Sequence, residues 1–172
     1  MKFYLKLSAC VVFAAAYGLF LWFRPIFWFT FVLGVPICFW IASWFHELGH
    51  FLAYRLWKLE WKRMAVGWFV FERGKGMRLD RQRKIWEACC TCAYDPDKSI
   101  GHYTVALLSG GLLVLALGVG AIIAGHFCGG SARSFLICFG GVCGMDAGWN
   151  LLPVSADRIL LRKIKEEREK TA

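Results

Sequence analysis

Residues 44–56 read WFHELGHFLAYRL and place two histidines and a glutamate inside one of the most apolar stretches of the chain. His46 and His50 are four residues apart, so on a helix their imidazoles lie one turn apart on the same face and can reach one metal ion. Glu47 lies beside them. A glutamate within a membrane span costs on the order of 2 to 3 kcal/mol or more, so an ionisable residue there indicates a functional site.

The composition favours a bilayer as the solvent around this stretch. Of the 172 residues, 58% are hydrophobic and 19% are charged, which is more apolar surface than a soluble domain of this size buries. The net charge of +9 would suggest nucleic acid in a soluble protein. Here the Lys and Arg residues fall in blocks between apolar runs, a pattern typical of membrane topology, and no nucleic-acid partner is expected.

Four apolar blocks have the length of about 20 residues that a membrane-spanning helix needs. They cover residues 7–23, about 29–54, about 103–125 and about 134–153. We therefore expect an all-α polytopic membrane protein with about four transmembrane helices. Residues 1–28 are expected to form a retained N-terminal transmembrane anchor that ends in a turn at Arg24 and Pro25.

The pattern of the loop at residues 57–101 allows a small membrane-associated β-hairpin. Apolar and aromatic residues at nearly alternate positions flank the turn signal Arg73-Gly74-Lys75-Gly76. The alternative is a basic, aromatic-rich loop that touches anionic headgroups. Residues 89–99, CCTCAYDPDKS, are expected to be a turn-rich linker, and residues 158–172 an amphipathic charged tail.

The distribution of Lys and Arg predicts the orientation. These residues gather before the first block, in the middle loop and after the fourth block, which leaves only Arg24 and Arg133 for the opposite side. Both termini and the middle loop are therefore expected to be cytoplasmic, in a multi-pass protein of a bacterial plasma membrane. Small residues at four-residue intervals predict close helix packing in the later spans: Ala116, Gly120 and Ala124, and Gly140, Gly144 and Gly148.

His46, Glu47 and His50 form the HExxH pattern, in which two neutral imidazoles bind zinc. The glutamate is placed to take a proton from a zinc-activated water that attacks a peptide carbonyl, and then to pass that proton to the leaving amine. Three cysteines crowd into the middle loop and could bind a metal or change redox state, but they have no second Cys or His pair at zinc-finger spacing: Cys89, Cys90 and Cys92.

A catalytic zinc usually takes three protein ligands, so a third ligand must be found. The candidates are His102 and His126, at the two ends of the third block, and Asp146 and Asp157, near the end of the fourth. His126 falls on the opposite side of the membrane and His102 at the interface. A rise of about 1.5 Å per helical residue places neither aspartate decisively level with the histidines, so both remain candidates.

Two segments together resemble the signatures of the site-2 protease family of intramembrane zinc metalloproteases. The first is WFHELGHFLAYRL, and the second is NLLPVSAD at residues 150–157. The resemblance covers residues of about 35–162. It implies an intramembrane metalloprotease core at residues 29–157 that binds one zinc ion per chain.

The resemblance also implies roles for single residues. His46 and His50 would be zinc ligands, Glu47 the catalytic base, and Asp157 the third ligand. Asn150 would help to hold the substrate or its developing oxyanion. The sequence departs from the family pattern after Asn150, because the spacing to Asp157 is one residue shorter and Arg158 stands in place of the usual glycine. Asp146 therefore remains the alternative third ligand.

The expected function is an intramembrane zinc endopeptidase that cuts a membrane-embedded or membrane-adjacent protein or peptide near the cytoplasmic face. The same resemblance favours the β-hairpin, against which the substrate would be held extended. Because the chain is short, selectivity is expected to come from membrane geometry or from a gating partner protein. One alternative is a catalytically silent membrane scaffold of the same fold. A metal transporter or sensor is a third hypothesis, but the histidines form one cluster and not a path across the membrane.

Overall fold

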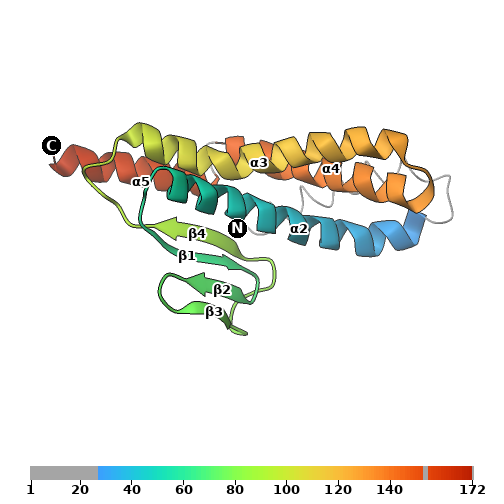
Figure 1. Ribbon diagram of the computed structural model, residues 1–172, viewed down its shortest axis with the longest axis horizontal. Helices are drawn as coiled ribbons and strands as arrows, with labels where there is room; N and C mark the ends of the chain where they lie inside the picture. Colours follow the sequence, from blue (N-terminus) through green and yellow to red (C-terminus); the bar gives the residue numbers. More distant parts are fainter. Residues whose placement is uncertain (1–26, 153–154, 172) are drawn as a thin grey trace.

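The computed structural model describes residues 27–152 and 155–171. The predicted first span at residues 7–23 and the turn at Arg24 and Pro25 lie outside them. In the described part, a sheet of four strands is inserted between the first two of four helices (Figure 1). The elements in chain order are α2 (Phe27–Leu56), β1 (Trp61–Val66), β2 (Phe69–Glu72), β3 (Gly76–Leu79), β4 (Ala88–Cys92), α3 (Ile100–Phe127), α4 (Gly130–Leu151) and α5 (Ala156–Thr171).

Helices α2, α3 and α4 form an elongated bundle, with α5 at one end (Figure 1). Helix α3 begins at the side-chain cap of Ser99, whose Oγ accepts a hydrogen bond from the backbone N–H of His102 at 3.4 Å. The turn between α3 and α4 contains Gly130 at a φ of +59°, a conformation that glycine adopts without strain. The short turn makes α3 and α4 antiparallel neighbours.

The prediction of an all-α protein with four spans is wrong. Within the described residues, α3 is the one helix long and apolar enough to cross a membrane. Histidines and a glutamate interrupt the apolar run of α2. The apolar run of α4 is interrupted by Arg133, Asp146 and Asn150. Counting apolar residues over each block gave too little weight to these polar positions. The fold is mixed α/β, because the middle loop forms a complete antiparallel sheet.

The sheet has the strand order β3-β2-β1-β4, with every neighbouring pair antiparallel. A hairpin does form around the predicted turn, where Gly74 and Gly76 adopt φ values of +81° and +75° and Glu72 pairs with Gly76. This hairpin is only the outer half of the sheet. After β1 the chain reverses direction at Gly67, which has a φ of +57°, so that β2 pairs with β1.

The prediction of a linker at residues 89–99 is wrong for its first four residues, because Ala88–Cys92 is strand β4. Cys90 pairs with Met64 of β1, and its side chain is buried in the core that joins the sheet to the helices. Burial against the helices, which depends on tertiary packing, therefore overrides a local sequence without strong strand formers.

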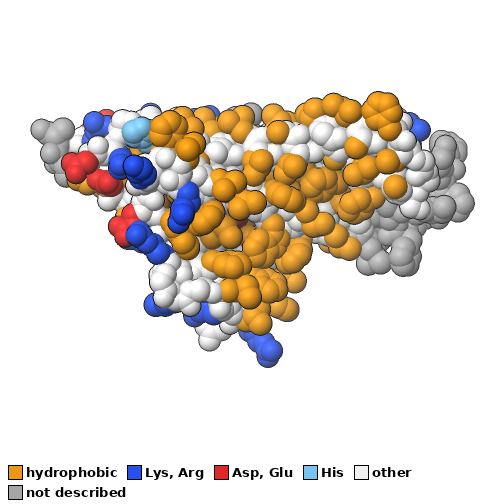
Figure 2. All heavy atoms as spheres, in the orientation of Figure 1, with side chains coloured by type: hydrophobic (Ala, Val, Ile, Leu, Met, Phe, Trp, Pro, Cys, Tyr) orange, Lys and Arg blue, Asp and Glu red, His pale blue; other side chains and the backbone are white. Residues whose placement is uncertain are grey.

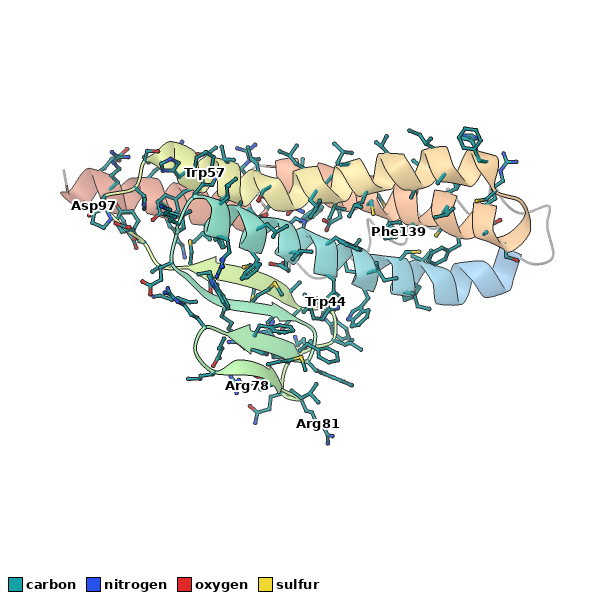
Figure 3. The ribbon with its side chains drawn as sticks, viewed as in Figure 1. Trp44, Trp57, Arg78, Arg81, Asp97 and Phe139 are labelled. Carbon is teal, nitrogen blue, oxygen red and sulfur yellow. The ribbon has the colours of Figure 1, made fainter. Side chains whose placement is uncertain are left out.

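Aromatic side chains fix the sheet to α2. The ring of Trp44 lies 5.8 Å from that of Phe69 and 6.0 Å from that of Phe71, and Phe51 packs against Trp61 at 5.0 Å. Figure 3 shows Trp44 between α2 and the sheet, with Arg78 and Arg81 at the far side of the sheet. These contacts hold β1 and β2 against the second half of α2, which carries the histidines, and β4 contacts the same helix.

Candidate metal centre

Two histidines from α2 and an aspartate from the start of α5 meet in the interior. His46 and His50 are only 6% and 2% exposed, and their Nε2 atoms lie 2.9 Å apart. Asp157 Oδ2 lies 3.5 Å from each of these nitrogens. One ligand atom from each residue falls within 4.8 Å of the others, so this cluster could hold a metal ion.

The outward nitrogens of both imidazoles have acceptors of their own. His46 Nδ1 lies 2.7 Å from Asp146 Oδ2 and donates to it, and His50 Nδ1 donates to the carbonyl oxygen of Ala106 at 2.8 Å. Such partners on the second nitrogen orient a ligating histidine and leave Nε2 as the metal-binding atom. Helices α4 and α3 thus aim the two imidazoles of α2 at one point.

The donor set fits a metal ion. Two Nε2 lone pairs that face each other at 2.9 Å repel unless a cation or a proton lies between them. A proton shared between the two nitrogens would leave Asp157 Oδ2 unsatisfied. This oxygen is buried and has no hydrogen-bond partner among the described residues. A metal ion satisfies all three atoms, and two imidazoles with one carboxylate are a donor set that zinc accepts.

Glu47 lies next to the cluster without ligating it. The side chain is 6% exposed, and its Oε2 has no hydrogen-bond partner in the described part of the chain. Glu47 lines a cavity of about 230 Å³ together with His46 and Asp157. A buried carboxylate with a free oxygen beside a metal site can accept a proton from a molecule that enters this cavity.

The cavity lies between the bundle and the sheet. Its walls come from α2, the β3–β4 connection, β4, α4 and α5. The residues that line it are Phe39, Ser43, His46, Glu47, Trp86, Ala88, Cys89, Cys90, Thr91, Asp146, Asn150, Ala156, Asp157 and Leu160. The polar cluster therefore opens toward β4, at the edge of the sheet.

The structure distinguishes the roles of the two aspartates, which the sequence spacing could not do. Asp157 lies on the Nε2 side of both histidines, whereas Asp146 lies at Nδ1 of His46. Asp146 thus orients a ligand, and Asp157 is the aspartate in the cluster. The sequence did not predict that Asp146 contacts Nδ1 of His46, the nitrogen that faces away from the cluster. It also missed Ala106, which acts through its backbone oxygen and so has no residue-type signal.

Asn150 lies on α4, one turn after Asp146. Its Nδ2 donates to the backbone oxygen of Asp146 at 2.8 Å and lies 3.3 Å from Asp146 Oδ2 and 3.2 Å from His46 Nδ1. Asn150 also lines the cavity. In this geometry the amide holds Asp146 near His46, and it must turn to reach a substrate.

His102 and His126, the other two histidines that the sequence offered, lie apart from this cluster, whereas Cys89 and Cys90 line the cavity beside it. His102 packs on Trp57 with a ring separation of 4.8 Å, and His126 lies in the last turn of α3. Cys90 lines the cavity, but burial raises the pKa of its thiol well above the usual range. Cys90 is not among the described residues whose ligand atoms form the cluster.

Comparisons of this chain with family models, with curated proteins and with solved structures give no match.

Proposed function

We propose that this protein is a zinc endopeptidase that acts at a membrane, as its resemblance to the site-2 proteases implies. The observation that carries this proposal is the His46, His50 and Asp157 cluster, with the free carboxylate oxygen of Glu47 in the same cavity. A structural zinc site would have four protein ligands and no need for such a base.

The residues have complementary tasks in peptide hydrolysis. His46, His50 and Asp157 would hold zinc, which supplies a Lewis acid that polarises a peptide carbonyl and acidifies water. Glu47 would take the proton of the attacking water and give it to the leaving amine. A binding scaffold would gain nothing from a buried carboxylate in this place. Asn150, through Asp146, would keep the imidazole of His46 in its ligating orientation.

Strand β4 could present the substrate to this site. It is an edge strand of the sheet, and Cys89, Cys90 and Thr91 line the cavity beside Glu47. An extended peptide can add to a strand edge through main-chain hydrogen bonds. A helical peptide hides its carbonyl groups in its own hydrogen bonds, so pairing with β4 would favour the unwound form that can be cut.

The surface of the bundle supports a membrane location. Hydrophobic side chains cover much of the visible face, whereas most charged side chains gather near α5 and at the outer end of the sheet (Figure 2). Apolar residues along α3 are exposed, Ile123 at 55%. We propose that α3 anchors the protein in the bilayer, with the metal cluster near the cytoplasmic face. The substrate would then be a membrane-embedded or membrane-adjacent protein or peptide.

The proposal is tested by Glu47→Gln in cells that express the full chain. The variant should keep about one zinc ion per chain, because Glu47 is not a ligand, and cleavage should fall by about 10²–10⁴-fold because the proton acceptor is lost. Mass spectrometry of new N-termini in the membrane proteome measures cleavage, and metal analysis of the purified protein measures zinc.

Glu87→Gln is the matched control, because Glu87 is exposed just before β4 and does not line the cavity. Unchanged new N-termini in Glu47→Gln would contradict the proposal, as would a wild-type protein that holds no zinc.

A further inference from the structure

Helix α3 contributes no ligand atom to the metal cluster in the described structure, yet its backbone lies against both histidines. A Cβ atom built on Gly110 would lie 2.6 Å from His50 Nε2 and 2.8 Å from His46 Nε2. Real Cβ atoms essentially never come so close to another heavy atom. The excluded position adjoins the point where the two Nε2 lone pairs converge, so a side chain here would compete with a metal ion for space.

The approach of α3 to α2 at this level is fixed by several contacts. A Cβ atom on Gly49 would lie 2.7 Å from the carbonyl oxygen of Ser109 and 2.8 Å from the Cα of Gly110. Ser109 Oγ donates to the carbonyl oxygen of Gly49 at 2.9 Å. The hydrogen bond from His50 Nδ1 to Ala106 lies in the preceding turn of α3. Helix α3 therefore cannot retreat from the histidines without breaking these bonds.

We propose that Gly110 is a positioning residue of the metal centre. Its missing side chain leaves the room in which the two imidazoles can share one ion, and the backbone of α3 closes this side of the coordination sphere. Glu47 and Asp157 line the cavity beside β4, whereas Gly110 does not appear in the described lining. The cavity beside β4 thus gives a fourth ligand or a substrate a way to the metal on the side away from Gly110. This inference rests on the metal binding in the proposed function and not on proteolysis.

The surroundings of the two glycines predict different failures. The nearest atoms to a Cβ on Gly110 are ring atoms at the ends of His50 and His46, whereas those around Gly49 belong to the backbone of α3. Ring atoms can be displaced by rotation of the side chain, but backbone atoms cannot move without shifting the helix. Gly110→Ala should therefore misplace the imidazoles and keep the fold, whereas Gly49→Ala should push the helices apart.

The test uses the full chain purified in detergent and loaded with Zn²⁺ or Co²⁺. Zinc affinity is measured by competition with a chelator, and the visible spectrum of bound Co²⁺ reports the coordination geometry. Gly110→Ala should lose zinc affinity by about tenfold or more, as expected when ligand orientation is disturbed, and should lose the Co²⁺ spectrum of wild type. Far-UV circular dichroism and the melting temperature of the metal-free protein should stay unchanged.

Gly111→Ala is the matched control, because a Cβ atom there makes an ordinary contact of 3.7 Å with Asn150. It should keep the zinc affinity and the Co²⁺ spectrum of wild type. Wild-type metal binding in Gly110→Ala would overturn the proposal. A fall in metal-free melting temperature as large as that of Gly49→Ala would also overturn it, because Gly110 would then be a packing residue. A wild type that binds zinc without cleaving any protein would remove the protease proposal and leave this one standing.

Discussion

The two ends of the helix bundle are built by different physical means. Near the sheet, the helices are joined by directional hydrogen bonds, such as His46 to Asp146 and Ser109 to the backbone of Gly49. At the other end the core consists of small and medium apolar side chains: Cys38, Ala42, Val114, Cys138, Val142 and Cys143. Directional bonds fix the orientation of side chains, whereas close apolar packing only holds the helices together. The metal cluster lies at the end where such bonds orient the side chains.

Close packing at the apolar end depends on two glycines of facing helices. A Cβ atom on Gly118 would lie 2.7 Å from Cys143 Cβ, and one on Gly140 would lie 2.7 Å from the carbonyl oxygen of Gly118. Gly140 belongs to the small-residue face that the sequence predicted for α4. Gly144 and Gly148, from the same predicted face, would meet nothing within 4 Å, so they are not needed for this approach.

The largest effect is expected at the sheet end, from the two aspartates. Asp157→Ala should abolish stoichiometric zinc binding, because it removes a ligand. Asp146→Ala should weaken zinc binding by only about 10–100-fold, the usual effect of losing the partner of a ligating histidine. Chelator competition on the purified proteins measures both affinities.

The conservative variants Asp157→Asn and Asp146→Asn serve as controls for side-chain volume. Asp146→Asn keeps an oxygen that can accept from His46 Nδ1, so its zinc affinity should exceed that of Asp146→Ala. Zinc binding by Asp157→Ala that equals wild type would show that the assignment of the two aspartates is reversed.

A smaller effect, on stability alone, is expected at the apolar end. Gly118→Ala inserts a methyl group into a filled contact between α3 and α4 and should lower the free energy of unfolding by about 1–3 kcal/mol. Zinc content per folded chain should not change, because the contact lies far along the helices from the cluster. Denaturant titration and metal analysis of the same samples measure the two quantities. Gly120→Ala should change neither, since its Cβ would meet nothing within 4 Å.

Local sequence patterns predicted those parts of this fold that depend on neighbouring residues. The long apolar runs marked α2, α3 and α4 to within a few residues, and the four-residue spacing placed His46 and His50 on one face of a helix. The rest depends on tertiary packing. The position of Asp157 relative to Asp146 follows from how the chain turns between α4 and α5, and the partner of His50 is a backbone oxygen. Strand β4 exists because Cys90 is buried against the helices, which its sequence does not indicate.

X-ray absorption at the zinc edge tests the central claim most directly, because the chain offers eight cysteines as competing ligands. Zinc bound by the wild-type protein in detergent should show only nitrogen and oxygen neighbours at about 2.0–2.2 Å, with the outer-shell scattering of two imidazoles. That result would agree with ligation by His46, His50 and Asp157. Sulfur neighbours at about 2.3 Å would contradict the account, because the metal would then be held by cysteines and not by this cluster.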